Sequence, residues 1–373
     1  MFIRSGYTQK INQKIAKIRK STDVNDIRSL PDFEKILANN PHAQFVQGYY
    51  VEIPLSEYQT FVPNAPLFPD RYGKAYTGGQ FDAPLFDLHE WRENWQKGHP
   101  KSNRPDLLVN ANWFNVWDTG IANKGQKINP RKQDRTYLIG LSVSSGKMVS
   151  SHQVLDQENI GLDTIVFDEA SKKAKLMFHQ EIETLCGDQK QNRASSKTAS
   201  SHSQGNIFEN KNAVSGFIIL QNGQMIPTPK LNNNHNNRLP RTGVGLKNDG
   251  KNAVILVIHN TKREYGVTAD EFAQLFSALK CDEAINLDNS GSVELYYRGP
   301  GHFGKKSVFV RTKTCDAGTS TERPKPNCLG FKNTCNTRFF AADDSDIARK
   351  KEMTDTVKSK DDGSINYTYY IKR

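Results

Sequence analysis

The sequence has no long apolar run. None of its 373 residues lies in a stretch that approaches the roughly 20 apolar residues of a membrane-spanning helix. Its beginning, MFIRSGYTQKINQ, also lacks the apolar core of a secretory signal. These two absences predict that the protein has no membrane span and is cytoplasmic. Export into a host by another route is left open.

Cysteine is scarce and poorly arranged for metal binding. The five cysteines form no Cys-x-x-Cys pair, and no histidine lies at zinc-ligand spacing from two of them. The sequence therefore predicts no metal and no cofactor, although an Asp-Asn cluster could hold a divalent ion. We expect reduced thiols; a disulfide among Cys315, Cys328 and Cys335 would require an exported protein.

Negative charge is the scarcer sign. The chain has 40 acidic and 51 basic residues, which gives a net charge of +11 and a pI near 9.2. This balance attracts polyanions, including nucleic acids, acidic glycans and phosphorylated small molecules. No compact basic stripe is interleaved with aromatic residues. That disfavours specific nucleic-acid binding, but leaves it open through the basic surface.

Most of the chain has the pattern of short strands joined by tight turns. Strand pairs are predicted within residues 137–150, 163–178, 213–226 and 242–260. The last two pairs turn at Asn222-Gly223 and Asp249-Gly250, which are strong two-residue hairpin signals.

One helix is clear. Thr268 and Glu271 have the spacing of a capping box. The apolar residues that follow share one helical face: Phe272, Leu275, Phe276 and Leu279. Many hairpins and one clear late helix predict an α+β fold, a single large domain of mostly antiparallel or mixed β-sheet with packed helices.

The composition divides the chain into three parts. Residues 1–41 are predicted to form a helical lead-in, residues 42–332 the main domain, and residues 333–373 a charged C-terminal extension. Within the domain, residues 186–212 form a polar insertion with few apolar side chains.

The stretch AINLDNSGSVELYY, residues 284–297, concentrates polar groups where a strand breaks and resumes. A tight turn alone does not need a carboxylate, two amides and two hydroxyls. Strand ends are rigid supports for reactive groups, so this stretch indicates a platform for chemistry.

The segment TADEFAQLFSALKCDEAINLDNSGS, residues 268–292, resembles the signature segment of the phosphodiester glycosidase family. That signature is a capped helix, a strand ending in Asn-Leu-Asp, and a Gly-rich turn with serines. Four more segments resemble the family's elements, in the family's order: VNANWF, AVSGFIILQNGQ, PRTGVGL and ERPKPNCLGF. The resemblance spans roughly residues 42–332. It implies a phosphodiester-glycosidase-like fold.

The turn departs from the family pattern. Where the family has three glycines after the aspartate, this chain has Asn289, Ser290 and Gly291, and Val293 replaces a second serine. A Cβ at the first two positions is expected to narrow the space available to a sugar or phosphate.

The resemblance implies the catalytic residues. Arg241 is a permanent cation whose planar fork can hold two phosphate oxygens, with Thr242 as a second donor. Asp288 is the carboxylate, acting as general base or as electrostatic or covalent partner of the anomeric carbon. Asn286 lies two residues before Asp288, so strand alternation predicts that it shares a face with Asp288. Taken alone, Arg241 would be assigned to a surface ion pair and Asp288 to a turn.

Further residues are predicted to bind substrate. Asn110 offers an amide from another strand, and Gly291 with Ser292 could present a backbone N–H and a hydroxyl to an anion. Trp113 could stack on a sugar or pack in the core. Glu294 shares the alternation with Ser292.

His259 has two open interpretations. Together with Asn260 it replaces a usual Asp-Gly of the family. It could titrate and assist proton transfer, or simply pack.

The function implied is hydrolysis of a sugar-1-phosphodiester, small molecule or phosphoglycan, to free sugar and a phosphomonoester. Two alternatives remain at this point: a non-catalytic binder of phosphoglycans or sugar nucleotides on the same fold, and a basic nucleic-acid-associated protein. We expect Asn110, Arg241, Thr242, Asn286 and Asp288 to line one cleft.

Overall fold

The computed structural model describes residues 24–62, 82–84, 86, 88, 91, 105–114, 135–150, 161–185, 207–226, 236–260, 265–297, 308–311 and 325–334. The predictions for residues 1–23, 186–206 and 335–373 lie outside these ranges.

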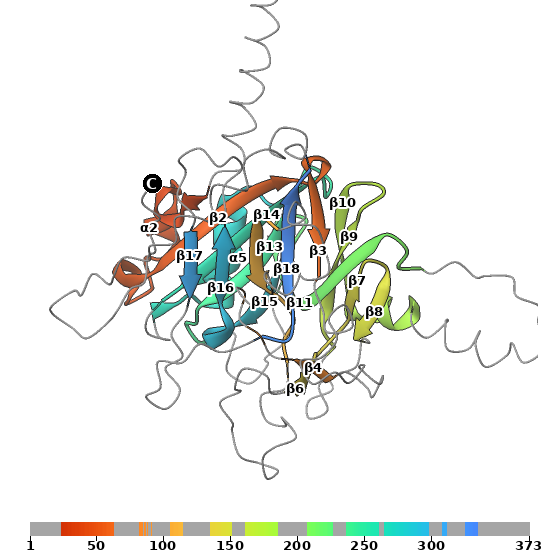
Figure 1. Ribbon diagram of the computed structural model, residues 1–373. Coiled ribbons are helices and arrows are strands. Elements are labelled where there is room, and N and C mark those ends of the chain that lie inside the picture. The colour runs from red at the N-terminus through yellow and green to blue at the C-terminus, as the bar shows by residue number, and fades with distance from the viewer. Residues whose placement is uncertain are drawn as a thin grey trace, which may run out of the picture.

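A large sheet of eleven described strands organises the fold (Figure 1). Its main path is β1 (Asn25–Asp26), β2 (Gln47–Pro54), β14 (Asn252–His259), β13 (Arg241–Lys247), β15 (Glu283–Asn289), β11 (Lys211–Gln221), β7 (Ser142–Ser144) and β8 (Lys147–Ser150). Off this path, β9 (Asp163–Asp168) and β12 (Gln224–Met225) pair with β11, and β10 (Lys173–Met177) pairs with β9. Strand β15 therefore lies in the middle, between β13 and β11.

A small sheet lies over one face of the large sheet (Figure 1). Its order is β17 (Val308–Arg311), β16 (Glu294–Tyr297), β5 (Leu107–Asn110), β18 (Cys328–Asn333) and β3 (Tyr58–Phe61). A separate pair joins β4 (Asp82–Pro84) to β6 (Arg135–Tyr137). All described strand pairings are antiparallel, which confirms the predicted mostly antiparallel sheet.

The two faces of the large sheet border different apolar cores. An inner core fills the space between the sheets, with Val257, Val244 and Leu287 from the large sheet and Val109 and Leu329 from the small one. An outer core lies between the large sheet and α5 (Ala269–Ala278). Successive strand residues alternate between these cores, because side chains leave a strand on alternate faces.

Helix α5 forms as predicted. Thr268 Oγ1 accepts from Glu271 N at 3.1 Å, and Glu271 Oε2 accepts from Thr268 N at 2.8 Å, so both halves of the capping box are present. The four predicted apolar residues of this helix are all buried in the outer core. Burial of each contributes about 1.5–3 kcal/mol.

The four predicted hairpins are confirmed as β7–β8, β9–β10, β11–β12 and β13–β14. Asn222 and Gly223 have φ of 50° and 74°, which are the left-handed values that a tight hairpin turn needs.

The end of the predicted lead-in packs on the domain. Residues 24–46 contain only short elements, namely η1 (Ile27–Ser29), α2 (Phe33–Ile36) and η2 (Ala43–Phe45), besides β1. Ile27, Phe33 and Leu37 are buried in the outer core. The boundary at residue 41 stays a prediction.

The polar insertion ends earlier than residue 212. Phe208 is buried in a third apolar cluster, and Lys211 and Asn212 already belong to β11. The correction has a simple cause: Ile207 and Phe208 are apolar side chains that the surrounding polar sequence concealed.

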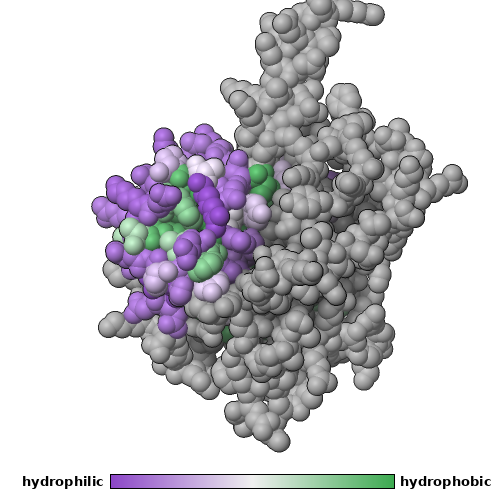
Figure 2. All heavy atoms as spheres, turned by 90° about the vertical axis from the view of Figure 1, so that its left-hand side faces the viewer, coloured by the Kyte–Doolittle hydropathy of each residue, from purple (hydrophilic) through white to green (hydrophobic). Residues whose placement is uncertain are grey.

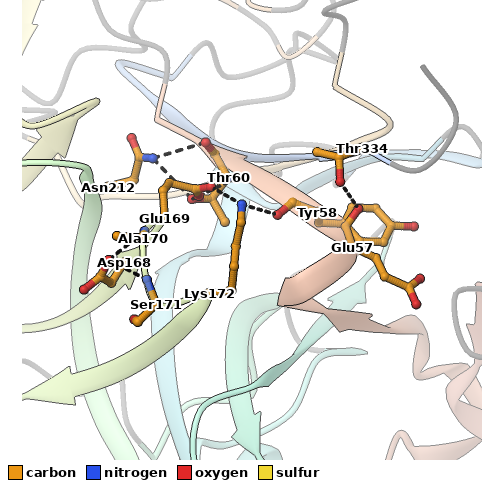
Figure 3. A network of polar contacts seen from close by, with 10 residues as sticks. All are labelled: Glu57, Tyr58, Thr60, Asp168, Glu169, Ala170, Ser171, Lys172, Asn212 and Thr334. Atoms are coloured by element: carbon orange, nitrogen blue, oxygen red, sulfur yellow. Dashed lines mark hydrogen bonds and ion pairs between the residues drawn. The ribbon is translucent and has the colours of Figure 1, made fainter. Parts of the chain in front are cut away.

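A polar network ties the small sheet to the large one (Figure 3). The Glu169 carboxylate accepts hydrogen bonds from Thr60 N and Oγ1, and it pairs with Lys172 Nζ at 2.7 Å. Asn212 Nδ2 donates to Thr60 O at 3.1 Å, and Lys172 Nζ donates to Tyr58 O at 3.2 Å.

The surface on the α2 side is mainly hydrophilic among the described residues, with smaller apolar areas between them (Figure 2). Within the described part of the chain, no helix has the length and apolarity needed to cross a membrane. Cys281 and Cys328 are free buried thiols, so Cys328 is not paired as the disulfide hypothesis allowed. Cys315 and Cys335 lie outside the described residues.

Candidate active site

A β-bulge lies within the predicted catalytic segment. Arg241 pairs with Asn289, and Gly243 pairs with Asn286, so three steps along β15 match two steps along β13. The bulge interrupts the regular pairing between Asn286 and Asn289, and a shared face for Asn286 and Asp288 stays a prediction. Bulges re-aim side chains and are common beside active sites. The pairing also brings the Cα atoms of Arg241 and Asp288 within about 10 Å.

The chain crosses from the large sheet to the small sheet at this bulge. Asp288 N donates to Ala111 O at 2.9 Å, just beyond the end of β5. Then η7 (Ser290–Ser292) leads into β16 of the small sheet. The predicted platform is thus the junction of the two sheets, which explains the broken strand.

Asn110 and Thr242 form a brace on the inner side of this junction. Thr242 Oγ1 donates to Asn110 Oδ1 at 2.6 Å, and Glu294 N donates to the same oxygen at 3.2 Å. Asn110 Nδ2 donates to Asp288 O at 2.7 Å. Asn110 and Thr242 are both fully buried. We call this pair the inner brace. Because the Asn110 carbonyl oxygen has two protein donors, the geometry supports a positioning role for it rather than direct substrate contact.

Arg241 and Asn286 lie on the other face. Arg241 pairs with Ile258 of the outer core, whereas Thr242 pairs with Val257 of the inner core. Asn286 pairs with Gly243, where an added Cβ would come within 2.7 Å of the Phe272 ring of α5. Asn110 and Thr242 therefore lie on the inner side of the large sheet and Arg241 and Asn286 on its outer side, and one cleft lined by these four and Asp288 stays a prediction.

Arg241 is only 1% exposed. Its Nε donates to Val267 O at 2.8 Å, and its Nη2 donates to Asn237 O at 3.2 Å. Nη1 lies 3.4 Å from Asn286 Oδ1. Burial lowers the pKa of Arg241 to about 9 from 12.5, an effect opposed by the nearby Glu271 and Asp270. The group remains a cation at neutral pH, and its bonds support positioning of Asn286 together with a positive potential.

Asp288 is 8% exposed. Its Oδ1 accepts from Asn289 N at 2.8 Å, and its backbone is fixed on both sides by the small-sheet contacts described above. The bond from Asn289 N restricts the orientation of the carboxylate, which a base or electrostatic group requires.

The turn after Asp288 keeps the backbone shape of a glycine. Ser290 has φ of 59°, a left-handed value that costs a non-glycine residue about 1–2 kcal/mol. Asn289 has an ordinary extended conformation, with φ of −130°. Gly291 and Ser292 are buried in η7, and Ser292 Oγ has no hydrogen-bond partner in the described structure. Of the two replaced glycines, only Ser290 is strained.

His259 stacks on Tyr49, with ring centroids 5.6 Å apart and planes 3° apart. Burial lowers its pKa to about 4, so it is neutral at physiological pH. A neutral imidazole does not act as an acid there, which favours the packing interpretation over proton donation.

Glu294 lies at the start of β16 in the small sheet. It is fully buried and forms an ion pair with Lys325, a residue that was not anticipated from the sequence. Leu88 N also lies 3.4 Å from Glu294 Oε2. The ion pair with Lys325 gives the Glu294 carboxylate a structural role, because a buried charge without a partner is strongly destabilising.

Trp113 packs against an apolar cluster of Ile139, Leu162 and Phe217. Its ring meets Phe217 edge-on at 5.5 Å, and Phe217 pairs with Asn286 on the neighbouring strand. Trp113, Phe217, Asn286 and Arg241 therefore form a connected outer row. A stacking role for Trp113 stays a prediction.

Sequence reasoning missed a buried amide pair behind the site. Asn327 Nδ2 donates to Asn112 Oδ1 at 2.9 Å, and Asn112 N donates to Asn327 Oδ1 at 3.0 Å. Asn112 Nδ2 also donates to Ile139 O and Leu141 O. The signal was present, because both asparagines lie in segments, VNANWF and ERPKPNCLGF, that resemble family elements. Among the described residues, no cluster of three or more metal-binding side chains occurs.

A family model for phosphodiester glycosidases matches residues 140–332, which is more than half of the chain. The chain belongs to the phosphodiester glycosidase family. The match contains the bulge, the turn, helix α5 and Arg241, while Asn110 and Trp113 precede it. A comparison with curated proteins gave no match.

Solved structures similar to this chain include a catalytic domain from zebrafish, N-acetylglucosamine-1-phosphodiester alpha-N-acetylglucosaminidase auto-inhibited by its pro-peptide. Its identity is 15% and its TM-score 0.43, with 76% of each chain covered. A putative exported protein from Burkholderia pseudomallei has 11% identity and a TM-score of 0.42, covering 77% of this chain and 74% of that one. A hypothetical protein from Synechocystis has 12% identity and a TM-score of 0.40 over 77% of this chain. This chain covers only 59% of the Synechocystis protein, less than two thirds of its length.

Proposed function

We propose that this member of the phosphodiester glycosidase family hydrolyses a sugar-1-phosphodiester and releases the free sugar and a phosphomonoester. Family membership supports the reaction class. The observation that carries the proposal is the bulge between β13 and β15, where Asp288 directly precedes Asn289, the residue whose backbone pairs with the buried cation Arg241.

Water attacks the anomeric carbon while the bond from that carbon to the phosphate oxygen breaks. The bonding electron pair leaves with the phosphate, and Asp288 takes the proton of the water as the new C–O bond forms. A phosphate is a good leaving group, so a strong general acid matters less than in an ordinary glycoside. This fits a site in which His259 is neutral and Glu294 is already paired.

Arg241 contributes a fixed positive potential where phosphate charge develops. Preorganised charge in a water-poor site stabilises a transition state more than the same charge does in bulk water. Its bond to Asn286 Oδ1, with the bond from Asn286 Nδ2 to Leu287 O, would fix the orientation of that amide, and the inner brace would hold the backbone of Asp288. Direct capture of phosphate by the Arg241 fork would require some of its present partners to be exchanged.

The test is turnover of a panel of sugar-1-phosphodiesters by the full chain, following release of reducing sugar. Asp288→Asn is the matched control, because it keeps the shape and removes the charge. Release by the parent chain and not by the variant is the expected result. If the parent binds these ligands and releases no sugar, the chain is a phosphoglycan-binding protein on a glycosidase fold.

A further inference from the structure

The indole N–H of Trp113 is buried and has no hydrogen-bond partner in the described part of the chain. The contrast with Trp91 is direct, because the indole N–H of Trp91 donates to Lys325 O at 2.8 Å. Buried tryptophan N–H groups usually find an acceptor, and an unpaired buried donor costs about 1–3 kcal/mol. The unpaired donor at Trp113 therefore calls for an explanation.

The surroundings fix the position of Trp113. Its carbonyl accepts from Ile139 N at 2.8 Å. The preceding residue, Asn112, is held by Asn327 and two further carbonyls, and Phe217 meets the indole ring edge-on. The backbone on both sides of the indole is thus held by hydrogen bonds, and one edge contact fixes its position against Phe217.

The location of Trp113 links it to the candidate site. Phe217 touches Trp113 and pairs with Asn286, and Asn286 meets the Arg241 guanidinium. Gly216, beside Phe217, lets the two strands approach, since a Cβ there would lie 2.2 Å from Asn286 O. Trp113 is therefore the far end of the outer row whose other end is the cation.

Resting on the proposed function, we propose that the indole N–H of Trp113 donates a hydrogen bond to an oxygen of the substrate's sugar, a ring hydroxyl or an N-acyl carbonyl, and so sets sugar specificity. The ligand class is a sugar-1-phosphodiester that carries an acceptor at this position. A site built to bond a substrate group rejects analogues that lack it, because the buried donor is then left unpaired.

The test compares Trp113→Phe with Trp91→Phe. Each variant keeps an aromatic ring and removes one indole N–H. For each protein, kcat/KM is measured with a sugar-1-phosphodiester and with its single-position deoxy or deacylated analogues. The parent and Trp91→Phe should prefer one acceptor-bearing sugar by about 10–100-fold. In Trp113→Phe that preference should fall to within about threefold, because only the acceptor-bearing substrate loses a bond. An unchanged preference, or an equal loss for every analogue, would overturn the proposal.

Two further readings separate this proposal from the proposed function. Trp91→Phe should have a lower melting temperature than Trp113→Phe, because only Trp91 loses a hydrogen bond that exists without substrate. The reverse order would contradict the assignment.

Equilibrium binding of the sugar 1-phosphates and their deoxy analogues repeats the specificity comparison without turnover. A parent that binds and discriminates but releases no sugar refutes the proposed function and leaves the Trp113 comparison decisive. A parent that neither binds nor turns over any of them refutes both.

Discussion

Arg241 and Thr242 are neighbours in β13, yet their side chains leave opposite faces of the large sheet and meet different partners. Arg241 points toward α5 and contacts Asn286, while Thr242 points between the sheets and donates to Asn110. The outer side carries a charge that donates to two backbone carbonyls and to the amide oxygen of Asn286. The inner side carries neutral groups that hold the backbone of Asp288. The neighbouring residues Arg241 and Thr242 thus supply a charged group suited to catalysis and a neutral group suited to holding the backbone of Asp288.

This difference teaches how to interpret a buried polar residue. Burial alone does not separate the two kinds, because Arg241 is 1% exposed and Thr242 0%. They differ in charge and in hydrogen bonding. In the inner brace, Thr242 and Asn110 bond to each other, whereas the outer row ends at Trp113 in a donor without a partner among the described residues. Five substitutions or conditions test this division, in order of decreasing expected effect.

Asp288→Asn should reduce kcat/KM for sugar release by about 10³-fold or more, roughly 4 kcal/mol, because it removes the base and the negative charge. Asn can still accept the bond from Asn289 N, so the melting temperature should stay within a few degrees of the parent's. Steady-state kinetics and a melting curve check both statements. Turnover equal to the parent's would show that another group is the carboxylate.

Arg241→Lys should reduce turnover by about 10²-fold, because an ammonium keeps the charge but cannot hold Val267, Asn237 and Asn286 together. The measurement is kcat, with the melting temperature as control for folding. Full activity in a stable Lys variant would mean that the planar fork has no role.

His259 should make stability depend on pH. Its pKa is about 4 in the folded chain against 6.5 when unfolded, so between these values the unfolded state binds the extra proton. Stability should therefore fall as pH drops from 6.5 to 4, by roughly 2–3 kcal/mol from this residue. Urea unfolding at several pH values, compared with His259→Gln, measures it. An equally steep loss in the variant would assign the effect to other groups.

Thr242→Val should lower the free energy of unfolding by about 1–2 kcal/mol, because it removes the 2.6 Å bond to Asn110 in a fully buried place. We expect turnover to fall by less than about tenfold, since Glu294 N still holds the Asn110 oxygen. Chemical unfolding and kcat are measured on the same preparation. A 10³-fold loss of turnover would place Thr242 among the reacting groups.

Ser290→Gly should raise the free energy of unfolding by about 0.5 kcal/mol. The left-handed φ of 59° costs serine about 1–2 kcal/mol, and part of the gain is offset by the greater freedom of glycine in the unfolded chain. Urea unfolding measures the change. A loss of stability would show that the serine side chain makes up for its strain.

Much of the fold could be predicted from local signals. Helix α5 was predicted from a capping box and an apolar face, and two of the hairpins were predicted from Asn-Gly and Asp-Gly turns. The assembly of Asp288 with Asn110 and Arg241 followed from resemblance, because nothing local to these residues states that they meet.

Three features of the site could not be predicted. The bulge depends on the register between two strands that are far apart in sequence, so the residues of β15 alone could not show it. The Lys325–Glu294 pair joins residues whose proximity comes only from the packing of the small sheet. The side of β13 on which each motif residue lies depends on which face α5 covers, and that is a property of the whole sheet.

The most direct test of the division between the two faces is to measure kcat/KM and the free energy of unfolding for Asp288→Asn and Thr242→Val in parallel. We predict that the variant with the larger loss of activity is the one with the smaller loss of stability. Asp288→Asn should lose at least about 100-fold more activity than Thr242→Val, and Thr242→Val should lose more stability. Equal losses of activity, or a variant at Asp288 that is less stable and fully active, would contradict it.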